Sequence, residues 1–182
     1  MKKVNVYLAN GFEEIEAVTV IDVLRRAGVE VTTVSITADR VVRGAHDIPV
    51  TADELFIRAD NEAADMLVLP GGMPGTTNLG EHEGLTELLK SFKSSGKYIA
   101  AICAAPMVIG KLGMLEGCCA TCYPGFEKYL AGANTKEDSV VQHDRFITSR
   151  GPGTAIHFAL KLVELLVDKA TSEQLRQGML VQ

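Results

Sequence analysis

The chain has 182 residues, of which 47% are hydrophobic and 23% charged, and its formal net charge is -5 at pH 7. This length and balance fit one globular domain of residues 1–182. The acids are scattered and no Lys/Arg run occurs, which excludes a nucleic-acid footprint and an anionic membrane as partners. No apolar run is long enough to span a bilayer, and the first apolar stretch favours a buried strand over a signal peptide, so we expect a cytoplasmic protein.

Short β-branched runs alternate with amphipathic stretches along the whole chain. The first part predicts strands at 3–9, 30–36 and 65–69, helices at 14–27 and 53–64, and a hairpin at 40–50. The second part predicts helices at 83–95, 104–112, 125–131, 154–167 and from 172, with strands at 98–102, 118–121, 140–141 and 145–149. Strands alternating with helices predict an α/β fold with a mostly parallel sheet covered on both faces.

In such sheets, reactive groups gather at the carboxyl ends of the strands. Three segments follow predicted strands and can meet there: residues 10–16, residues 70–76 and the turn at Cys103. Their convergence is the main reason to look for a site at this edge.

Cys103 stands between a buried strand and a helix whose first turn contains Pro106. The small neighbours Ala101, Ala104 and Ala105 allow a tight turn, the device that α/β-hydrolases use for a nucleophilic serine. Free N–H groups at the start of a helix favour a thiolate there. The alternative is a buried structural cysteine.

Gly71 and Gly72 follow the neighbouring strand in the sequence PGGMPG. Glycines let backbone N–H groups approach a ligand, as an oxyanion hole requires, although an ordinary turn has the same composition. The spacing matches neither a dinucleotide-binding nor a Walker motif.

Three acids, Glu13, Glu14 and Glu16, begin the first predicted helix. Glu13 and Glu14 are expected to complement the helix dipole. Glu16 is expected near the sheet edge if Ile15 and Val18 pack inward, and a carboxyl group beside a thiolate keeps its proton longer.

The remaining cysteines and the histidines give weaker indications. The pattern C-x-x-C at Cys119 and Cys122 suggests a redox or zinc site, but residues three apart on a strand face opposite sides, so we predict reduced, structural thiols and no metal. Cys122, at the strand's end, can approach Cys103. No histidine is adjacent to Cys103 among the four of the chain, His46, His82, His143 and His157.

Taken together, these segments resemble the ThiJ/PfpI superfamily, in the branch that contains the human Parkinson-disease protein and bacterial ThiJ-like proteins. The resemblance covers nearly the whole chain and rests on five blocks in order: NGFEEIE (10–16), DVLRRAG (22–28), VLPGG (68–72), AAICAAP (100–106) and TSRGPGT (148–154).

The resemblance implies a flavodoxin-like three-layer sandwich with a nucleophile elbow of the class I glutamine amidotransferase type. It implies Cys103 and Glu16 as the catalytic pair. The oxyanion and substrate-binding positions are Gly71, Gly72, Ala104 and Tyr123. Tyr123 stands where many animal relatives have a histidine, which puts any mechanism that needs this base in doubt. Ala104 in place of histidine, and the lack of a late His-x-Glu pair, argue against peptidase and amidotransferase activities.

Two functional hypotheses remain open at this stage. The first is a cofactor-free enzyme that acts on methylglyoxal- or glyoxal-type 2-oxoaldehydes or their early glycation adducts, similar to a glyoxalase or deglycase. The second is a non-enzymatic oxidative-stress sensor or chaperone that uses oxidation of Cys103. The resemblance also implies a homodimer, with the first helix and the hairpin near His46 as expected contacts.

Overall fold

Strand β1 (Lys3–Leu8) lies in the interior of the main sheet, between β6 and β2, and is buried along almost its whole length. The computed structural model describes residues 1–182. The seven strands of the sheet follow the spatial order β10 (Val140–His143), β11 (Phe146–Ser149), β7 (Tyr98–Ile102), β6 (Met66–Leu69), β1, β2 (Glu30–Ser35) and β5 (Glu54–Leu55). All neighbours are parallel except the edge pair of β10 and β11.

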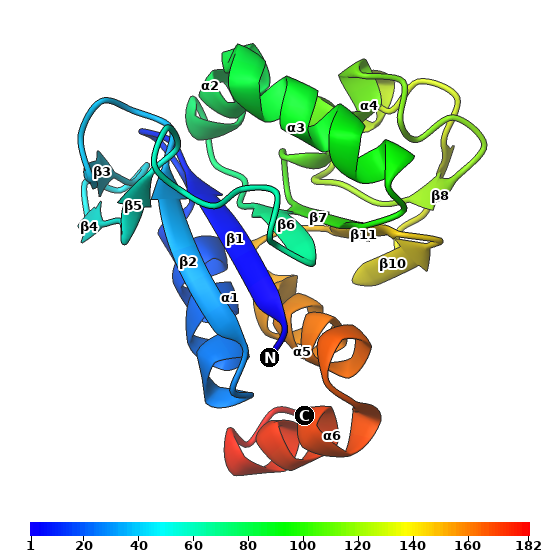
Figure 1. Cartoon of the computed structure of the whole chain (residues 1–182). Coiled ribbons are helices and arrows are strands. Elements are labelled where there is room, and N and C mark those ends of the chain that lie inside the picture. Colours follow the sequence, from blue (N-terminus) through cyan, green and yellow to red (C-terminus); the bar gives the residue numbers. More distant parts are fainter.

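Helices cover both faces of this sheet (Figure 1). One face carries α1 (Glu14–Arg26), α5 (Ala155–Leu166) and α6 (Lys169–Gly178). The other face carries α2 (Gly75–Glu81), α3 (Glu83–Ser94) and α4 (Pro106–Lys111). Short 3₁₀ helices occur at η1 (Glu127–Tyr129) and η2 (Pro152–Thr154). Small two-stranded sheets pair β3 (Val41–Arg43) with β4 (Pro49–Thr51) and β8 (Cys119–Ala120) with β9 (Asn134–Thr135). The three-layer flavodoxin-like fold is thereby confirmed.

The sheet divides the hydrophobic core in two, because successive side chains of a strand point to opposite faces. Val4 and Val6 of β1 pack into the cluster that contains the apolar side of α1 and α5. Tyr7 packs into the second cluster, with Leu85 and Leu89 of α3. Burial on both faces explains why the central strands have continuous apolar sequences.

The predicted helix at 53–64 is wrong. Residues of this segment form the short edge strand β5, which pairs with β2, and turns follow it. The Asp53 carboxylate accepts hydrogen bonds from the Thr33 N–H at 2.8 Å and hydroxyl at 2.7 Å, and the Phe56 N–H donates to the Ser35 carbonyl. These hydrogen bonds to β2 stabilise the strand more than the weak helix propensity of the segment stabilises a helix.

Helix α2 was not predicted, because Gly75 and Gly80 are poor helix formers. The C-terminal helix α6 begins at Lys169, three residues before the predicted start, where the Asp168 carboxylate accepts a hydrogen bond from the Thr171 N–H at 2.7 Å. The predicted hairpin is present as β3–β4, and the two strands predicted at 140–141 and 145–149 are present as β10 and β11, which pair antiparallel at one edge of the sheet. No helix combines the length and the apolar character needed to cross a membrane.

Candidate active site

Cys103 occupies a sharp turn directly after β7, and its backbone φ of 66° lies in the left-handed region that non-glycine residues rarely adopt. The turn is held from both sides. The Cys103 N–H donates to the Ser149 carbonyl at 2.9 Å, and the Cys103 carbonyl accepts a hydrogen bond from the Tyr123 N–H at 2.8 Å. Only 9% of the cysteine is exposed. A rare backbone conformation kept by surrounding contacts is typical of functional positions.

Glu16 is fully buried in the first turn of α1. Its Oε2 atom accepts a hydrogen bond from the Gly71 N–H at 2.7 Å. The carboxyl group also interacts with the Cys103 side chain. Burial raises the pKa of Glu16, whereas this interaction lowers it. The buried Oε1 atom of Glu16 has no hydrogen-bond partner within the chain. The structure therefore brings Glu16, Gly71 and Cys103 together at the carboxyl edge of the sheet.

Gly71 and Gly72 leave room that any side chain would fill. A Cβ atom on Gly71 would lie 2.6 Å from the Cys103 Cβ and 2.7 Å from the Glu16 Oε2 atom. Gly72 has a φ of 88°, and a Cβ atom there would collide with the backbone of Glu13. The glycines are thus required by close approach and by a positive φ, not by a generic turn.

The surroundings of Cys103 and Glu16 do not favour the thiolate that the sequence predicted at Cys103. Burial, the Glu16 charge and the hydrogen bond with Glu16 raise the pKa of the Cys103 thiol, while the N–H groups of Ala104 and Gly72 oppose this rise. Burial raises the pKa of Glu16 to about 7, against hydrogen bonds from Cys103 and Gly71. Two buried acids in contact titrate as a pair, so the thiolate becomes favourable when Glu16 carries the shared proton.

The expected orientation of α1 is wrong, although Glu16 lies where it was predicted. Ile15 and Val18 point outward, with 57% and 49% of their surface exposed. The buried side of the helix consists of Glu14, Glu16, Ala17, Val20, Val23 and Leu24. Glu16 reaches the sheet edge because it belongs to this buried side.

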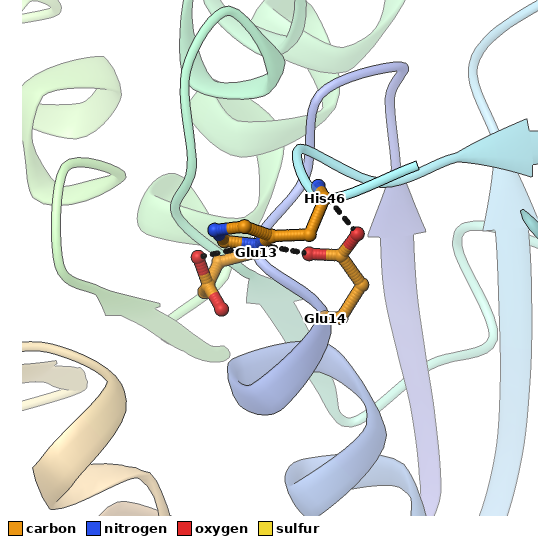
Figure 2. Close-up of side chains that lie close together, drawn as sticks. All are labelled: Glu13, Glu14 and His46. Atoms are coloured by element: carbon orange, nitrogen blue, oxygen red, sulfur yellow. Dashed lines mark hydrogen bonds and ion pairs between the residues drawn. The ribbon is translucent and has the colours of Figure 1, made fainter. Parts of the chain in front are cut away.

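Glu14 has a partner that the sequence did not indicate. Its carboxylate accepts hydrogen bonds from the His46 N–H at 2.7 Å and pairs with the His46 Nδ1 atom at 2.9 Å (Figure 2). Although burial opposes it, these bonds lower the pKa of Glu14. The two residues lie 32 positions apart, and an acid in the first turn of a helix already has a general explanation, so no local pattern could have revealed the pair.

Glu13, Glu14 and His46 form a group of three side chains whose ligand atoms lie within 4.8 Å of one another, a spacing compatible with a cation. We assign no metal to them, because the Glu14 carboxylate is already paired with His46 and with backbone N–H groups. This group stands beside the pair of Cys103 and Glu16, since the Glu13 N–H donates to the Gly71 carbonyl at 2.9 Å.

The other three cysteines, like Cys103, are free thiols. Cys122 packs into the core cluster on the opposite side of the sheet from Cys103, together with Cys118. The imidazole of His143 accepts a hydrogen bond from the Cys119 N–H at 3.2 Å. The imidazole of His82 accepts one from the Leu85 N–H, which begins α3. These histidines have structural partners.

Tyr123 reaches the turn through its backbone, whose N–H group bonds the Cys103 carbonyl. Its side chain is 46% exposed and packs edge-on against Phe126, 6.4 Å between ring centroids. A Cβ atom on Gly151 would lie 3.2 Å from the Tyr123 ring. An exposed aromatic ring therefore stands on the segment that holds the cysteine turn.

Comparisons with known proteins agree with this geometry. Residues 2–165 match the model of the DJ-1/PfpI family. Protein dj-1beta of Drosophila melanogaster is 40% identical over 182 residues, which cover 99% of this chain and 97% of that protein. The Caenorhabditis elegans protein named glutathione-independent glyoxalase DJR-1.2 is 39% identical over 157 residues, covering 85% of this chain and 82% of its own. The solved structure of oxidized Toxoplasma gondii DJ-1 superposes with a TM-score of 0.95 at 41% identity, covering 99% of this chain and 98% of that one. The chain belongs to the DJ-1/PfpI family.

Proposed function

We propose that this chain is a cysteine-dependent, cofactor-free enzyme that acts on methylglyoxal- or glyoxal-type 2-oxoaldehydes, or on their early glycation adducts. The observation that carries the proposal is the Glu16 carboxyl group, buried between the Gly71 N–H and the Cys103 side chain. Addition to an aldehyde needs a nucleophile and a proton donor in contact, and this pair supplies both. The related C. elegans protein, which is named a glutathione-independent glyoxalase, supports the substrate class.

The reaction begins when the Cys103 sulfur attacks the aldehyde carbon. A C–S bond forms, the carbonyl electrons move to oxygen, and the proton of Glu16 goes to that oxygen, which gives a hemithioacetal. We assign the oxygen that becomes negative to the N–H groups of Gly72 and Ala104, the same groups that oppose the rise in the pKa of the Cys103 thiol.

Glu16 then completes the conversion by moving a second proton. It removes the proton from the former aldehyde carbon and returns it to the neighbouring ketone carbon, while the hydroxyl proton of the hemithioacetal passes to the ketone oxygen. The first carbon is oxidised to a thioester and the second is reduced to an alcohol, so no external redox partner is needed. Water adds to the thioester, the C–S bond breaks, and a 2-hydroxy acid leaves with Cys103 restored. We assign the exposed ring of Tyr123 to contact with the substrate, not to proton transfer, because a tyrosine is a poor base at neutral pH.

Substitution of Glu16 tests the assignment. In Glu16→Gln, the amide still donates a hydrogen bond to the sulfur but cannot release a proton, so Cys103 should remain labelled by iodoacetamide while lactate formation from methylglyoxal is lost. In Glu16→Leu both should be lost, because the donor is gone and an apolar neighbour raises the thiol pKa. Glu30→Gln, at an exposed acid, is the matched control. Lactate formation at the wild-type rate in Glu16→Gln would remove Glu16 from the mechanism.

A second candidate function is a redox sensor in which Cys103 is oxidised to a sulfinate that Glu16 holds by hydrogen bonding. The close structural relative from T. gondii is described as oxidized, which favours this alternative. Wild-type protein that forms no lactate, but whose Cys103 is converted to sulfinate by mild peroxide, would support the sensor over the enzyme.

We also infer that the chain acts as a single cytoplasmic domain of residues 1–182 that forms a homodimer. Three large apolar side chains are exposed on α1 and the hairpin: Ile15, Val18 and Ile48, the last with 56% of its surface exposed. Burying them against a second copy removes apolar surface from water. Light scattering should give twice the 19.5 kDa mass of the chain at micromolar concentration, and a monomer would refute the dimer.

A further inference from the structure

The hairpin between β3 and β4 places an imidazole between two carboxylates of α1 (Figure 2). The His46 Nδ1 atom lies 2.9 Å from the Glu14 Oε2 atom and 3.7 Å from the Glu13 Oε2 atom. The two carboxylates are mostly buried, with 8% and 12% of their side chains exposed, whereas the imidazole is 68% exposed. Within a single chain, the imidazole therefore lies beside two carboxylates that solvent scarcely reaches.

The hairpin is fixed to the helix start by more than this ion pair. The Ala45 N–H donates to the Phe12 carbonyl at 2.8 Å, and the Gly11 N–H donates to the Arg43 carbonyl at 2.8 Å. Gly44 is pressed against the Glu14 carboxylate so closely that a Cβ atom there would collide with it. His46 thus has a defined position relative to Glu13 and Glu14.

Glu13 connects this ion pair to the reactive pair. Its N–H group donates to the Gly71 carbonyl at 2.9 Å, and the Gly71 N–H donates to the Glu16 Oε2 atom at 2.7 Å. The Glu13 charge adds to the rise in the pKa of Glu16 that burial causes. Within one chain, His46 is the only basic side chain in an ion pair with Glu13 or Glu14, and Arg43 of the same hairpin pairs with Asp47.

We propose that His46 is a positioning residue for the pair of Cys103 and Glu16: its imidazolium holds Glu13 and Glu14, offsets one of their two negative charges and thereby sets how tightly the buried pair keeps its shared proton. When His46 loses its proton, the negative charge beside Glu16 increases, and the shared proton becomes harder to remove whichever atom carries it. The hydrogen bond to Glu14 and the charges of both acids raise the pKa of His46, so this change falls on the alkaline side of its ordinary range. This proposal rests on the same pair of residues as the proposed function, but it holds whether or not the protein converts 2-oxoaldehydes.

The pH dependence of Cys103 alkylation by iodoacetamide tests this proposal in the full-length protein. His46→Gln keeps a hydrogen-bonding group but removes the charge, so the midpoint of the alkylation profile should rise by about half a unit. His46→Arg keeps a permanent cation, so its midpoint should lie at or below that of the wild type. His157→Gln on α5 is the control for loss of a histidine elsewhere and should leave the profile unchanged.

Two results would overturn the proposal. One is a wild-type midpoint in His46→Gln; the other is an equal upward shift in His46→Gln and His46→Arg, which would assign the effect to packing and not to charge. Lactate formation is measured in parallel. If the wild type forms none, the proposed enzyme fails, while the alkylation profiles still decide the role of His46.

Discussion

Gly71→Ala is the smallest change that should disable the proposed site, because it adds one methyl group between Cys103 and Glu16. The new Cβ atom would lie 2.6 Å from the Cys103 Cβ, 2.7 Å from the Glu16 Oε2 atom and 2.9 Å from the Ile102 carbonyl, where ordinary contact begins at 3.4 Å. The cysteine and the methyl group must therefore separate by about 0.8 Å. Overpacking of this kind costs about 1–3 kcal/mol, less than the usual stability of a domain, so the variant should still fold.

A displacement near 1 Å at the reacting atoms reduces rates by about 100-fold. We expect this loss in iodoacetamide labelling of Cys103 and in lactate formation, with a cooperative urea transition at a lower midpoint. Gly80→Ala in α2 is the matched control, because its Cβ atom would meet only Val108, at an ordinary 3.7 Å. It should react like the wild type and gain up to about 1 kcal/mol of stability. A folded Gly71→Ala with wild-type labelling would refute the steric reasoning.

Three further outcomes are expected. Mild peroxide should oxidise Cys103 to the sulfinic acid before the other three cysteines, as located by mass spectrometry; earlier oxidation of another thiol would contradict the site. Although burial opposes it, hydrogen bonds from Thr33 and the charge of Arg25 lower the pKa of Asp53, so its stabilisation is present above the unfolded pKa of about 4 and is lost as the pH falls through the folded value. In urea unfolding, Asp53→Asn should therefore lower the free energy of unfolding by about 1 kcal/mol near pH 7 and by much less near pH 3. The loss near pH 7 is small because half-exposed charges are screened by solvent. An equal loss at both pH values would show that the charge of Asp53 does not contribute to stability. Phe158→Ala should lower the free energy of unfolding by about 3–5 kcal/mol, because this side chain is fully buried; a loss below about 1 kcal/mol would show that the core closes over the gap.

The sequence predicted the elements whose side chains face one environment throughout. The strands at β1, β6 and β7 are buried on both faces, so their apolar runs are unambiguous. The segment 53–64 was mistaken for a helix, because its pairing with β2 depends on residues 20 positions away. Helix α2 was missed because glycines are poor helix formers, and one of them, Gly75, lies against the backbone of Gly11 and Phe12.

The same limit applies to the site. Cys103 and the glycine loop were found because strand ends and small residues are local features. Glu16 was expected near the sheet edge on the assumption that Ile15 and Val18 pack inward, and that assumption is wrong. The sequence does not show which face of the helix an acid occupies when apolar residues stand on both sides of it. The contacts of His46 with Glu13 and Glu14 join a hairpin to a helix start, and such long-range contacts leave no periodic pattern in one sequence.

The turn that presents Cys103 is held by backbone bonds from residues 123 and 149, which come 20 and 46 positions later in the chain. Synthesis therefore produces the cysteine well before the groups that impose its conformation, and parallel pairing between β7 and β11 cannot form until the later strand has emerged. A nascent or truncated chain that ends before β11 lacks the Ser149 carbonyl that holds this turn. Under the proposed function, labelling of Cys103 that depends on Glu16 would therefore report that the carboxyl-terminal third of the chain has folded onto the sheet.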